Sequence, residues 1–311
     1  MGSLFVLEGT FISSNFYQAI MNTRLGHGFS AAGLINLFVV YVIWGSTYLA
    51  IRVGVRDGSG FEPFTLAGMR VFVAGTLMLL FALMTKRKMR ISFSEFLRLL
   101  LYGILFWLGG NGLVSYAEQR VASGLAALFI GAIPIWTATL ESFLDRRPPK
   151  LMLLLSLLVG FGGIIVLSLP VLSTGIHADI FAIGLLIIAA VSWGSGSVIQ
   201  ARKRLDMDIL VNSGYQQFFG GLILLTAAFI SGEKLPSPIP EAWAAWAYLV
   251  IFGSIIAYSA FMKALELLPT NIVMTYAYVN PIIAVLLGWL ILAERPTIHT
   301  IAGALLVIVG V

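Results

Sequence analysis

Residues 270–292 read TNIVMTYAYVNPIIAVLLGWLIL, with Pro281 near the centre. The run contains no charged residue. A helix of about 20 mostly apolar residues is long enough to cross the hydrocarbon layer of a bilayer. This stretch therefore predicts a transmembrane helix that carries a proline in its interior.

The composition extends this prediction to the whole chain. Of its 311 residues, 59% are hydrophobic and 11% are charged, whereas soluble domains carry about 25% charged residues. So few charges cannot cover a water-facing surface, and the apolar excess must face lipid. We expect an all-α membrane protein with ten transmembrane helices, at roughly 33–54, 65–85, 96–117, 122–143, 150–170, 179–199, 211–231, 243–263, 270–292 and 297–311.

The two ends of the chain are treated separately from the spans. Residues 1–32 contain no basic segment followed by a continuous apolar run, so they do not resemble a signal peptide. We expect an N-terminal tail, in which Met1-Gly2-Ser3 resembles a start added by a vector. At the other end the last apolar run continues to Val311, which leaves open whether the native chain extends further.

Several function classes lack the residues that they need. The chain has no cysteine, which excludes disulfides and thiolate metal sites. His27, His177 and His299 are far apart, and no Walker A loop or zinc-protease motif is present. We therefore expect no catalytic residue, metal or cofactor. The net charge of +5 is interpreted as cytoplasmic Lys and Arg, not as a surface for nucleic acid.

The orientation follows from the loop charges. If the amino terminus is cytoplasmic, the inner side carries 13 Lys and Arg residues and the outer side carries 5. Cytoplasmic loops of membrane proteins are enriched in these residues. The bias predicts that both termini are cytoplasmic.

The chain also contains an internal repeat. An offset of 147 residues aligns Pro134 with Pro281 and Gly163 with Gly310. An offset of 149 aligns the triplet that begins at Trp44 with the triplet that begins at Trp193, both reading Trp-Gly-Ser. Each unit, 33–170 and 179–311, holds five spans. Because five is odd, the second unit must enter the membrane from the opposite side, and inverted repeats place a transport site near the midplane.

The second unit resembles a known family. The residues that carry the resemblance are Ala264-Leu265-Glu266, Pro281, Ala293-Glu294-Arg295-Pro296 and Gly303-Ala304-Leu305-Leu306, and they are similar to the second EamA repeat. The first unit has a weaker version, with Trp44-Gly45-Ser46 and Pro134. Over about 33–311 the chain resembles the drug/metabolite transporter superfamily, and within it the YddG-type exporters of aromatic amino acids.

The resemblance implies a bundle with a central cavity. Spans 1, 3, 4, 6, 8 and 9 would line it, and spans 5 and 10 would pack at the periphery. Small four-helix relatives that export cations carry a proton-binding glutamate in the first helix. The span 33–54 has no carboxylate, so proton coupling through such a residue is not expected.

Pro134 and Pro281 are expected near the middle of spans 4 and 9. A mid-helix proline frees the carbonyl four residues earlier, here Ile130 and Ala277. In lipid such a carbonyl needs a neighbour or a wet cavity. The two prolines therefore predict either kinks that line the cavity and accept a hydrogen bond from a substrate ammonium, or simple packing kinks.

Six other residues are candidates for substrate binding. Trp44 and Trp193 could stack on an aromatic substrate or contact an ammonium, although they could equally pack beside their Gly-Ser neighbours. Asn111 and its repeat mate Tyr258 are polar groups at membrane depth, which must find a partner. Asn111 could bind a carboxylate through its NH₂ group or form a hydrogen bond to a neighbouring helix. Tyr276 and Asn280 are four residues apart and share a helix face that leads into Pro281, which favours them over Tyr278.

The charged residues near membrane depth are few. Arg70 could hold a substrate carboxylate, but we favour a structural ion pair or a side chain that reaches the interface, because span 2 is not an expected lining helix. Glu141 and the pair Lys263 and Glu266 lie near cytoplasmic helix ends, where gating or simple solvation are both open.

These observations predict a multi-pass protein of the inner (plasma) membrane that works as a secondary transporter. The expected cargo is a small metabolite, above all a neutral or aromatic amino acid, because the candidate lining is aromatic and neutral-polar. The alternatives are an exporter of another small metabolite or drug, a channel, or a membrane enzyme. The lipid bilayer is the expected partner besides the cargo, with no nucleic acid and no obligate protein partner.

Overall fold

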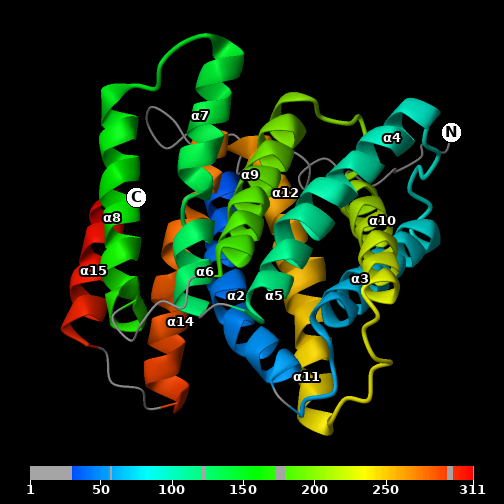
Figure 1. Cartoon of the computed structure of the whole chain (residues 1–311). Coiled ribbons are helices and arrows are strands. Elements are labelled where there is room, and N and C mark those ends of the chain that lie inside the picture. Colours follow the sequence, from blue (N-terminus) through cyan, green and yellow to red (C-terminus); the bar gives the residue numbers. More distant parts are fainter. Residues whose placement is uncertain (1–29, 57, 121–122, 173–178, 293–296, 311) are drawn as a thin grey trace, which may run out of the picture.

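The computed structural model describes residues 30–56, 58–120, 123–172, 179–292 and 297–310, and the regular structure of these residues is helical (Figure 1). Eight helical stretches are long and apolar enough to cross a membrane. They are Ala31–Val55, Pro63–Met84, Phe93–Ala117, Leu128–Asp145, Leu151–Pro170, Ile180–Arg202, Pro240–Leu267 and Thr270–Leu287.

Two of the ten expected spans are helical but do not meet this criterion. Helix α10 (Ile209–Ile230) is 22 residues long, but Asn212, Gln216 and Gln217 lower its apolar character. All three side chains are buried, so the polar groups face neighbouring helices. Helix α15 (Ile298–Gly310) has only 13 residues within the described chain.

Several spans consist of more than one helical segment. The span Phe93–Ala117, for example, comprises three segments, and so does Pro240–Leu267. The remaining elements are α2 (Ala31–Val55), α3 (Pro63–Met84), α4 (Phe93–Tyr102), η1 (Gly103–Gly112), α5 (Leu113–Ala117), α6 (Ser123–Ile130), α7 (Ile133–Asp145), α8 (Leu151–Leu172), α9 (Ile180–Arg202), α11 (Pro240–Tyr248), η2 (Leu249–Ile256), α12 (Ala257–Leu267), α13 (Thr270–Val273) and α14 (Tyr276–Leu292). The segments η1 and η2 are π-helical, a wider winding that is rare and often marks functional sites.

The repeat is visible in how the helices pair. The π-helical segments occupy nearly the same place in both units, since η1 shifted by 147 residues gives 250–259 and η2 is Leu249–Ile256. Helix α3 packs against its repeat mate α10, and α8 packs against its mate α15. The pair α8 and α15 lies at the side of the bundle in Figure 1.

Glycines allow α8 and α15 to approach closely. A Cβ added at Gly163 would lie 2.8 Å from the carbonyl oxygen of Gly303, and one added at Gly303 would lie 2.7 Å from that of Gly163. Small residues at helix contacts let backbones meet in membranes, where lipid provides no hydrophobic drive for helix association. The pair is therefore held by backbone contact.

A carboxylate fastens α3 to the end of α10. Glu233, which follows α10, accepts hydrogen bonds from the backbone N–H groups of Phe64 (2.8 Å) and Thr65 (2.7 Å). These N–H groups have no partner within their own helix, and a negative charge is favourable at a helix N-terminus. The contact fixes the loop after α10 against the start of α3.

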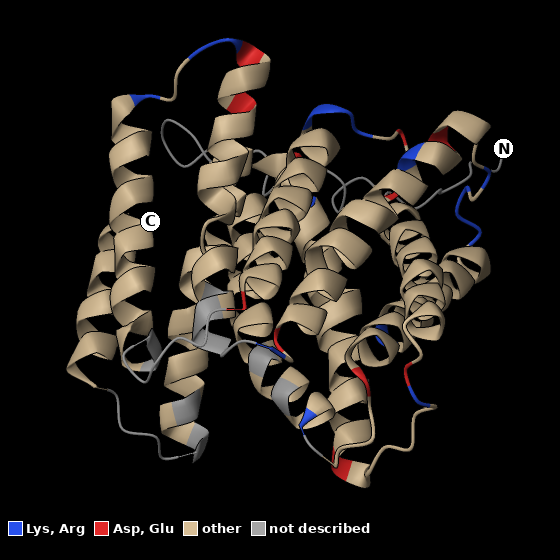
Figure 2. Cartoon of the chain, viewed as in Figure 1, with Lys and Arg blue, Asp and Glu red and all other residues tan. Residues whose placement is uncertain are grey.

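Most charged residues lie at two opposite ends of the bundle, which we call the basic end and the far end (Figure 2). The basic end carries the loops at 85–92, 146–150 and 203–208, which together hold most of the Lys and Arg residues of the connections. The far end carries the connection at 58–62, the loop at 231–239 and the C-terminal end of α5.

Pro134 lies near the middle of its span, as expected, but at a break between two helices and not inside one helix. The span breaks at Gly131 and Ala132, and Pro134 stands in the first turn of α7. That position tolerates proline, since its missing N–H would have no helical partner there. Pro281, by contrast, lies inside α14, as expected.

Candidate functional site

A cavity of about 670 Å³ lies between the two repeats. It is lined by the six expected spans, through α2, η1 with α5, α6, α9, η2 and α14. Helix α3 also contributes, through Arg70, which the sequence analysis did not expect of span 2. The lining residues of α2 run from Trp44 to Val55, and Arg56, which follows α2, lines the cavity too and is exposed at the far end. The cavity therefore runs from the middle of the bundle to the far end.

The floor of the cavity is aromatic. The Trp44 ring centroid lies 4.9 Å from that of Tyr276, 5.1 Å from that of Phe261 and 5.6 Å from that of Trp193. The indole N–H of Trp44 donates to the carbonyl oxygen of Gly253 in η2, at 3.0 Å. Such edge-to-face contacts and the hydrogen bond fix the orientation of the ring. The two repeats thus meet at Trp44.

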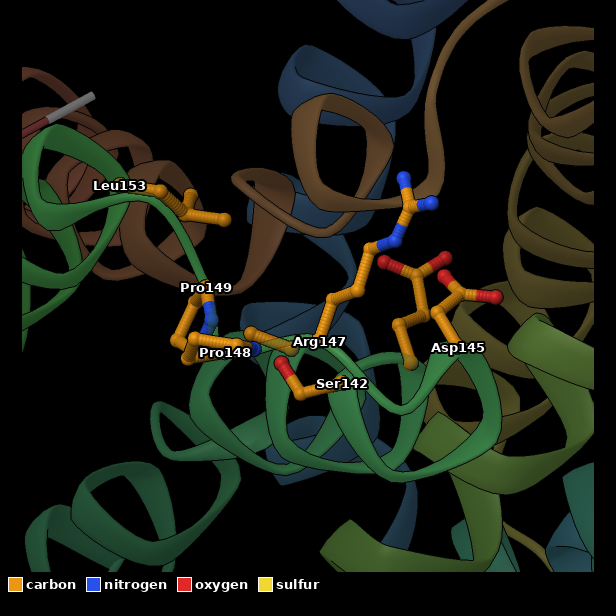
Figure 3. A pocket seen from close by; sticks show the side chains of 8 residues that line it. Ser142, Asp145, Arg147, Pro148, Pro149 and Leu153 are labelled. Carbon is orange, nitrogen blue, oxygen red and sulfur yellow. The ribbon is translucent and has the colours of Figure 1, made fainter.

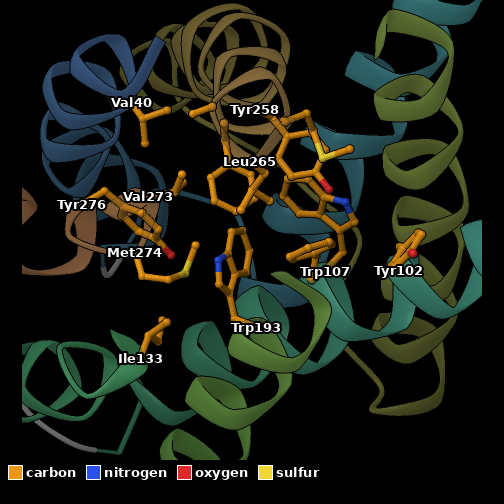
Figure 4. Close-up of a cluster of buried hydrophobic side chains, with 14 of the residues drawn as sticks. Val40, Tyr102, Trp107, Ile133, Trp193, Tyr258, Leu265, Val273, Met274 and Tyr276 are labelled. Carbon is orange, nitrogen blue, oxygen red and sulfur yellow. The ribbon is translucent and has the colours of Figure 1, made fainter. Parts of the chain in front are cut away.

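Apolar packing closes the bundle between this floor and the basic end. Phe261, Leu265 and Met274 are all at most 2% exposed, and the hydroxyl of Tyr41 forms a hydrogen bond with the hydroxyl of Thr275. Figure 4 shows Trp193 between Tyr276 and Trp107, with Leu265 and Met274 nearby. The cavity thus has one open and one sealed side.

Five of the six predicted binding residues line the cavity: Trp44, Asn111, Trp193, Tyr276 and Asn280. Asn280 is 2% exposed, and its Oδ1 has no hydrogen-bond partner within the described residues. The Nε1 of Trp193 is likewise buried without a partner there. A cavity lining with unused polar atoms is suited to bind a polar ligand, because unpaired buried groups cost free energy.

Tyr258 differs from its repeat mate Asn111. It is fully buried and is not among the residues that line the cavity. Its ring packs 4.9 Å from that of Trp107, and its hydroxyl donates to Oε1 of Gln216 at 2.6 Å. Nε2 of Gln216 donates in turn to Oδ1 of Asn212 at 2.7 Å. Tyr258 therefore belongs to a buried polar network behind the cavity wall.

The prolines also differ. Pro281 lines the cavity, whereas Pro134 is buried beside the lining residue Ile133. Ile130, whose carbonyl the sequence analysis expected to be free, lines the cavity as well. The residues on either side of the break, Ile130 and Ile133, therefore line the cavity, whereas the proline itself does not.

Arg70 lies at the cavity, whereas the sequence predicted a structural ion pair or a side chain that reaches the interface. It is 7% exposed, and its Nη2 donates to Oδ1 of Asn111 at 3.3 Å. Its Nε has no partner in the described part of the chain. The four ion pairs of the described residues do not include it, so the expected structural ion pair is not formed among them.

Glu118 lines the cavity at its far end, one residue beyond the span Phe93–Ala117. Burial raises the pKa of its carboxyl to about 7 from the ordinary 4.5, since low polarity disfavours the charged form. The other charged lining residues that the structure describes are Arg56 and Arg70. Glu118 is thus poised to change its charge near neutral pH.

Sequence reasoning missed Trp107 and Arg70 as lining residues. Trp107 stands in a glycine-rich π-helical segment, and a Cβ added at Gly220 of α10 would lie 2.3 Å from its Cδ1. The glycine run after Trp107 was the available signal. For Arg70 the signal was its depth in an otherwise uncharged span.

A second pocket, of about 370 Å³, lies at the basic end, between the end of α7 and the start of α8 (Figure 3). Ser142, Asp145, Arg147, Pro148 and Pro149 line it, and Glu141 contributes too. Asp145 is paired with Arg202 at 2.7 Å.

Lys263 and Glu266 form a separate ion pair at 2.8 Å. Because these groups are paired or solvated, we assign them no ligand.

No three His, Asp or Glu side chains come together as metal ligands in the parts of the chain that the structure covers. The site is defined by aromatic rings, amides, the deep guanidinium of Arg70 and, at the far end, Arg56 and Glu118, in a cavity between repeated helical units. This arrangement is typical of a multi-pass α-helical transporter. The EamA-like transporter family matches residues 31–169 and 180–311. The chain belongs to this family, which is part of the drug/metabolite transporter superfamily.

Known relatives agree with this assignment. The chain is 36% identical over 255 residues to YedA, an uncharacterized inner membrane transporter of Escherichia coli K12, covering 81% of this chain and 80% of that one. It is 24% identical over 280 residues to YoaV, an uncharacterized transporter of Bacillus subtilis, covering 89% and 94%. A solved crystal structure matches with a TM-score of 0.75 at 18% identity, over 91% of this chain and 96% of that one, which shows a shared fold.

Proposed function

We propose that the protein is a secondary transporter that works by alternating access and exports small metabolites, with neutral and aromatic amino acids as its main cargo. The observation that carries the proposal is the central cavity, which is open at one end and sealed at the other by Trp44 and its aromatic neighbours. A site between inverted repeats can be exposed to either side when the halves exchange conformations.

The proposed topology has ten spans and cytoplasmic termini. Helices α10 and α15 are the seventh and tenth spans, since each is the repeat mate of a helix that meets the span criterion. The basic end faces the cytoplasm, because positively charged loops are retained there. The far end, with Arg56 and Glu118, then faces outward, and the conformation described is outward-open.

The lining determines which cargo fits. A volume of about 670 Å³ is within the range of small-molecule sites. Trp44, Trp193 and Tyr276 offer ring faces for an apolar or aromatic side chain, and Asn111 and Asn280 offer amide groups to a polar head. The resemblance to YddG-type exporters points to the same class of cargo. Nucleotides and sugar phosphates fit poorly, because several negative charges would be desolvated against a single deep cation.

Two rival functions are less well supported. A channel needs a continuous path, whereas the packing around Phe261 and Met274 interrupts this one. A membrane enzyme needs a catalytic constellation, and the described lining residues offer no nucleophile with an adjacent base. Within transport, export of another small metabolite or a drug remains the second candidate, because the aromatic floor suits any apolar molecule.

The test is counterflow in proteoliposomes that contain the purified protein. Preloaded phenylalanine or methionine should accelerate uptake of the labelled amino acid, and unlabelled phenylalanine, tryptophan, methionine and threonine should compete better than aspartate and lysine. Uptake that is neither saturable nor accelerated by preloaded substrate would contradict a carrier. Stronger competition by aspartate or a sugar phosphate would contradict the proposed cargo.

A further inference from the structure

Arg70 occupies an unusual place for a cation. It lies on α3 within the bundle, is 7% exposed and lines the central cavity. A guanidinium carries five N–H donors. The side chain of Arg70 makes only one hydrogen bond among the described residues, at 3.3 Å to Asn111, and its Nε is buried without a partner. A deep cation with unused donors therefore faces the cavity.

A contact between α3 and η1 does not by itself explain why residue 70 is charged. Shifted by 147 residues, Arg70 corresponds to Gln217 of α10. Nε2 of Gln217 donates to the carbonyl oxygen of Ser254 in η2, at 3.1 Å. The second repeat thus connects the equivalent helices through a neutral amide. Because a buried charge costs more than an amide, Arg70 calls for a function beyond helix contact.

The chemistry of the guanidinium selects the missing partner. Its planar fork matches the two oxygens of a carboxylate, and such charge-assisted pairs are the strong ones. Asn111 accepts from Arg70 through Oδ1, so its NH₂ group remains to donate to the same ligand. Arg56 is exposed at the far end. One deep cation is suited to a group with one negative charge and not to a phosphate with two.

We propose that Arg70, together with Asn111, binds the carboxylate of the cargo. This inference rests on the proposed function, because it assumes that the central cavity is the transport site. Trp44, Trp193 and Tyr276 then contact the remainder of the molecule. The cargo class becomes small apolar or aromatic molecules that carry one carboxylate.

Matched pairs of ligands test the carboxylate directly. The first pair is phenylalanine and phenylalaninamide in counterflow competition. The second is 3-phenylpropionate and its amide, with binding measured as a rise in the melting temperature of the purified protein. The wild type should prefer the carboxylate of each pair by about 10- to 100-fold in apparent affinity, the range of hydrogen bonds to charged groups. An equal response to both members of the second pair would overturn the inference.

Variants assign the preference to Arg70. In Arg70→Gln the apparent affinities for the carboxylate and the amide of each pair should differ by no more than about twofold. The affinity for the amides should stay nearly unchanged. Arg70→Lys keeps a charge but loses the fork, so it should retain only part of the preference, and it serves if the glutamine variant does not fold. Arg90→Gln, an exposed cation of the basic end, is the control and should behave as wild type. An unchanged ratio in folded Arg70→Gln or Arg70→Lys would overturn the inference.

The two ligand pairs separate this inference from the proposed function. If no amino acid shows counterflow but the melting assay still distinguishes 3-phenylpropionate from its amide through Arg70, the carboxylate site stands and the amino acid cargo fails. If amino acids are exchanged but Arg70→Gln keeps the full preference for carboxylates, the transporter stands and the role of Arg70 fails.

Discussion

Trp44 and Trp193, which begin the two copies of one Trp-Gly-Ser triplet, meet edge to face with ring centroids 5.6 Å apart and planes at 76°. They do not have equal partners. The N–H of Trp44 donates to Gly253, whereas the N–H of Trp193 is buried without a partner among the described residues. The two repeats therefore differ in side-chain hydrogen bonding where these two tryptophans meet.

Trp44 provides the first prediction. Trp44→Phe keeps a ring but removes the N–H donor to Gly253, so we expect counterflow to fall about fivefold, the value of one hydrogen bond. Trp44→Ala also removes the contacts with Tyr276 and Phe261 and should reduce counterflow at least about tenfold. Initial rates in proteoliposomes, normalised to inserted protein, measure both effects.

Trp243→Phe is the matched control for Trp44. Trp243 lies on α11 and is 42% exposed, away from the cavity lining. Its variant should transport within about twofold of wild type. A correctly folded Trp44→Ala protein with the wild-type rate would assign Trp44 to helix packing alone.

The sequence was informative about the fold because lipid restricts the chain so strongly. A backbone in hydrocarbon must satisfy its own hydrogen bonds, so long uncharged runs such as 151–170 can be interpreted only as helices. Helix α10 was found by the same rule despite Gln216 and Gln217, because the polar residues occupy a small part of it. The break at Gly131 was missed, since a run of apolar residues does not reveal where a helix is interrupted.

The site was less predictable. A sequence indicates how deep a residue lies in the membrane, but not which neighbour its helix face meets. Arg70 was seen to be deep, but the face of α3 that meets the cavity depends on how α3 packs against α10. Tyr258 was assigned to the lining because Asn111 is its repeat mate. Repeat mates of different size and chemistry need not share an environment, and here Asn111 lines the cavity while Tyr258 is buried.

The second prediction concerns topology. The chain has no cysteine, so a single introduced cysteine reports its own position. Lys234→Cys at the far end should react with a membrane-impermeant maleimide in intact cells, and Lys88→Cys and Lys203→Cys at the basic end should not. All three side chains are exposed, so accessibility is limited only by the membrane. The loop at 171–178 is expected outside as well, although 173–178 fall outside the described residues.

Permeabilised cells provide the control for this labelling. Lys88→Cys and Lys203→Cys should react fully once the membrane is opened. Labelling of both in intact cells, with Lys234→Cys protected, would reverse the proposed orientation and make the cavity open to the cytoplasm.

The third prediction concerns the contact between α8 and α15. The Cβ of Gly163→Ala would lie 2.7 Å from the backbone nitrogen of Val307 and 2.8 Å from the carbonyl oxygen of Gly303. Backbone cannot move aside as a side chain can, so we expect a loss of about 1–3 kcal/mol in unfolding free energy. Thermal melting of the purified protein in detergent measures the loss.

The neighbouring glycine is an internal control. A Cβ added at Gly162 would meet no atom within 4 Å, and Gly162→Ala should be neutral or stabilise α8 by up to about 1 kcal/mol. Both variants gain the same helix propensity from alanine. The difference between their melting temperatures therefore reports the contact between α8 and α15. Equal melting temperatures would show that α8 and α15 do not depend on this close approach.

The last prediction concerns pH. The pKa of Glu118 is raised to about 7 by burial, so the folded protein holds a proton between about pH 4.5 and 7 that the unfolded chain releases. Stability decreases with rising pH wherever the folded state binds more protons. The contribution of Glu118 should therefore be fully retained below about pH 4.5, decline up to about pH 7 and be constant above it.

Glu118→Gln removes this titration, because an amide stays neutral. Relative to wild type, the variant should gain about 1–3 kcal/mol between pH 4.5 and pH 8, seen as a smaller fall of its melting temperature. Glu241→Gln, at an exposed carboxylate of the far end, should keep the wild-type profile. Parallel profiles for wild type and Glu118→Gln would mean that Glu118 is ionised and solvated at the cavity entrance, and that Arg56 and Arg70 face a permanent negative charge in the same cavity.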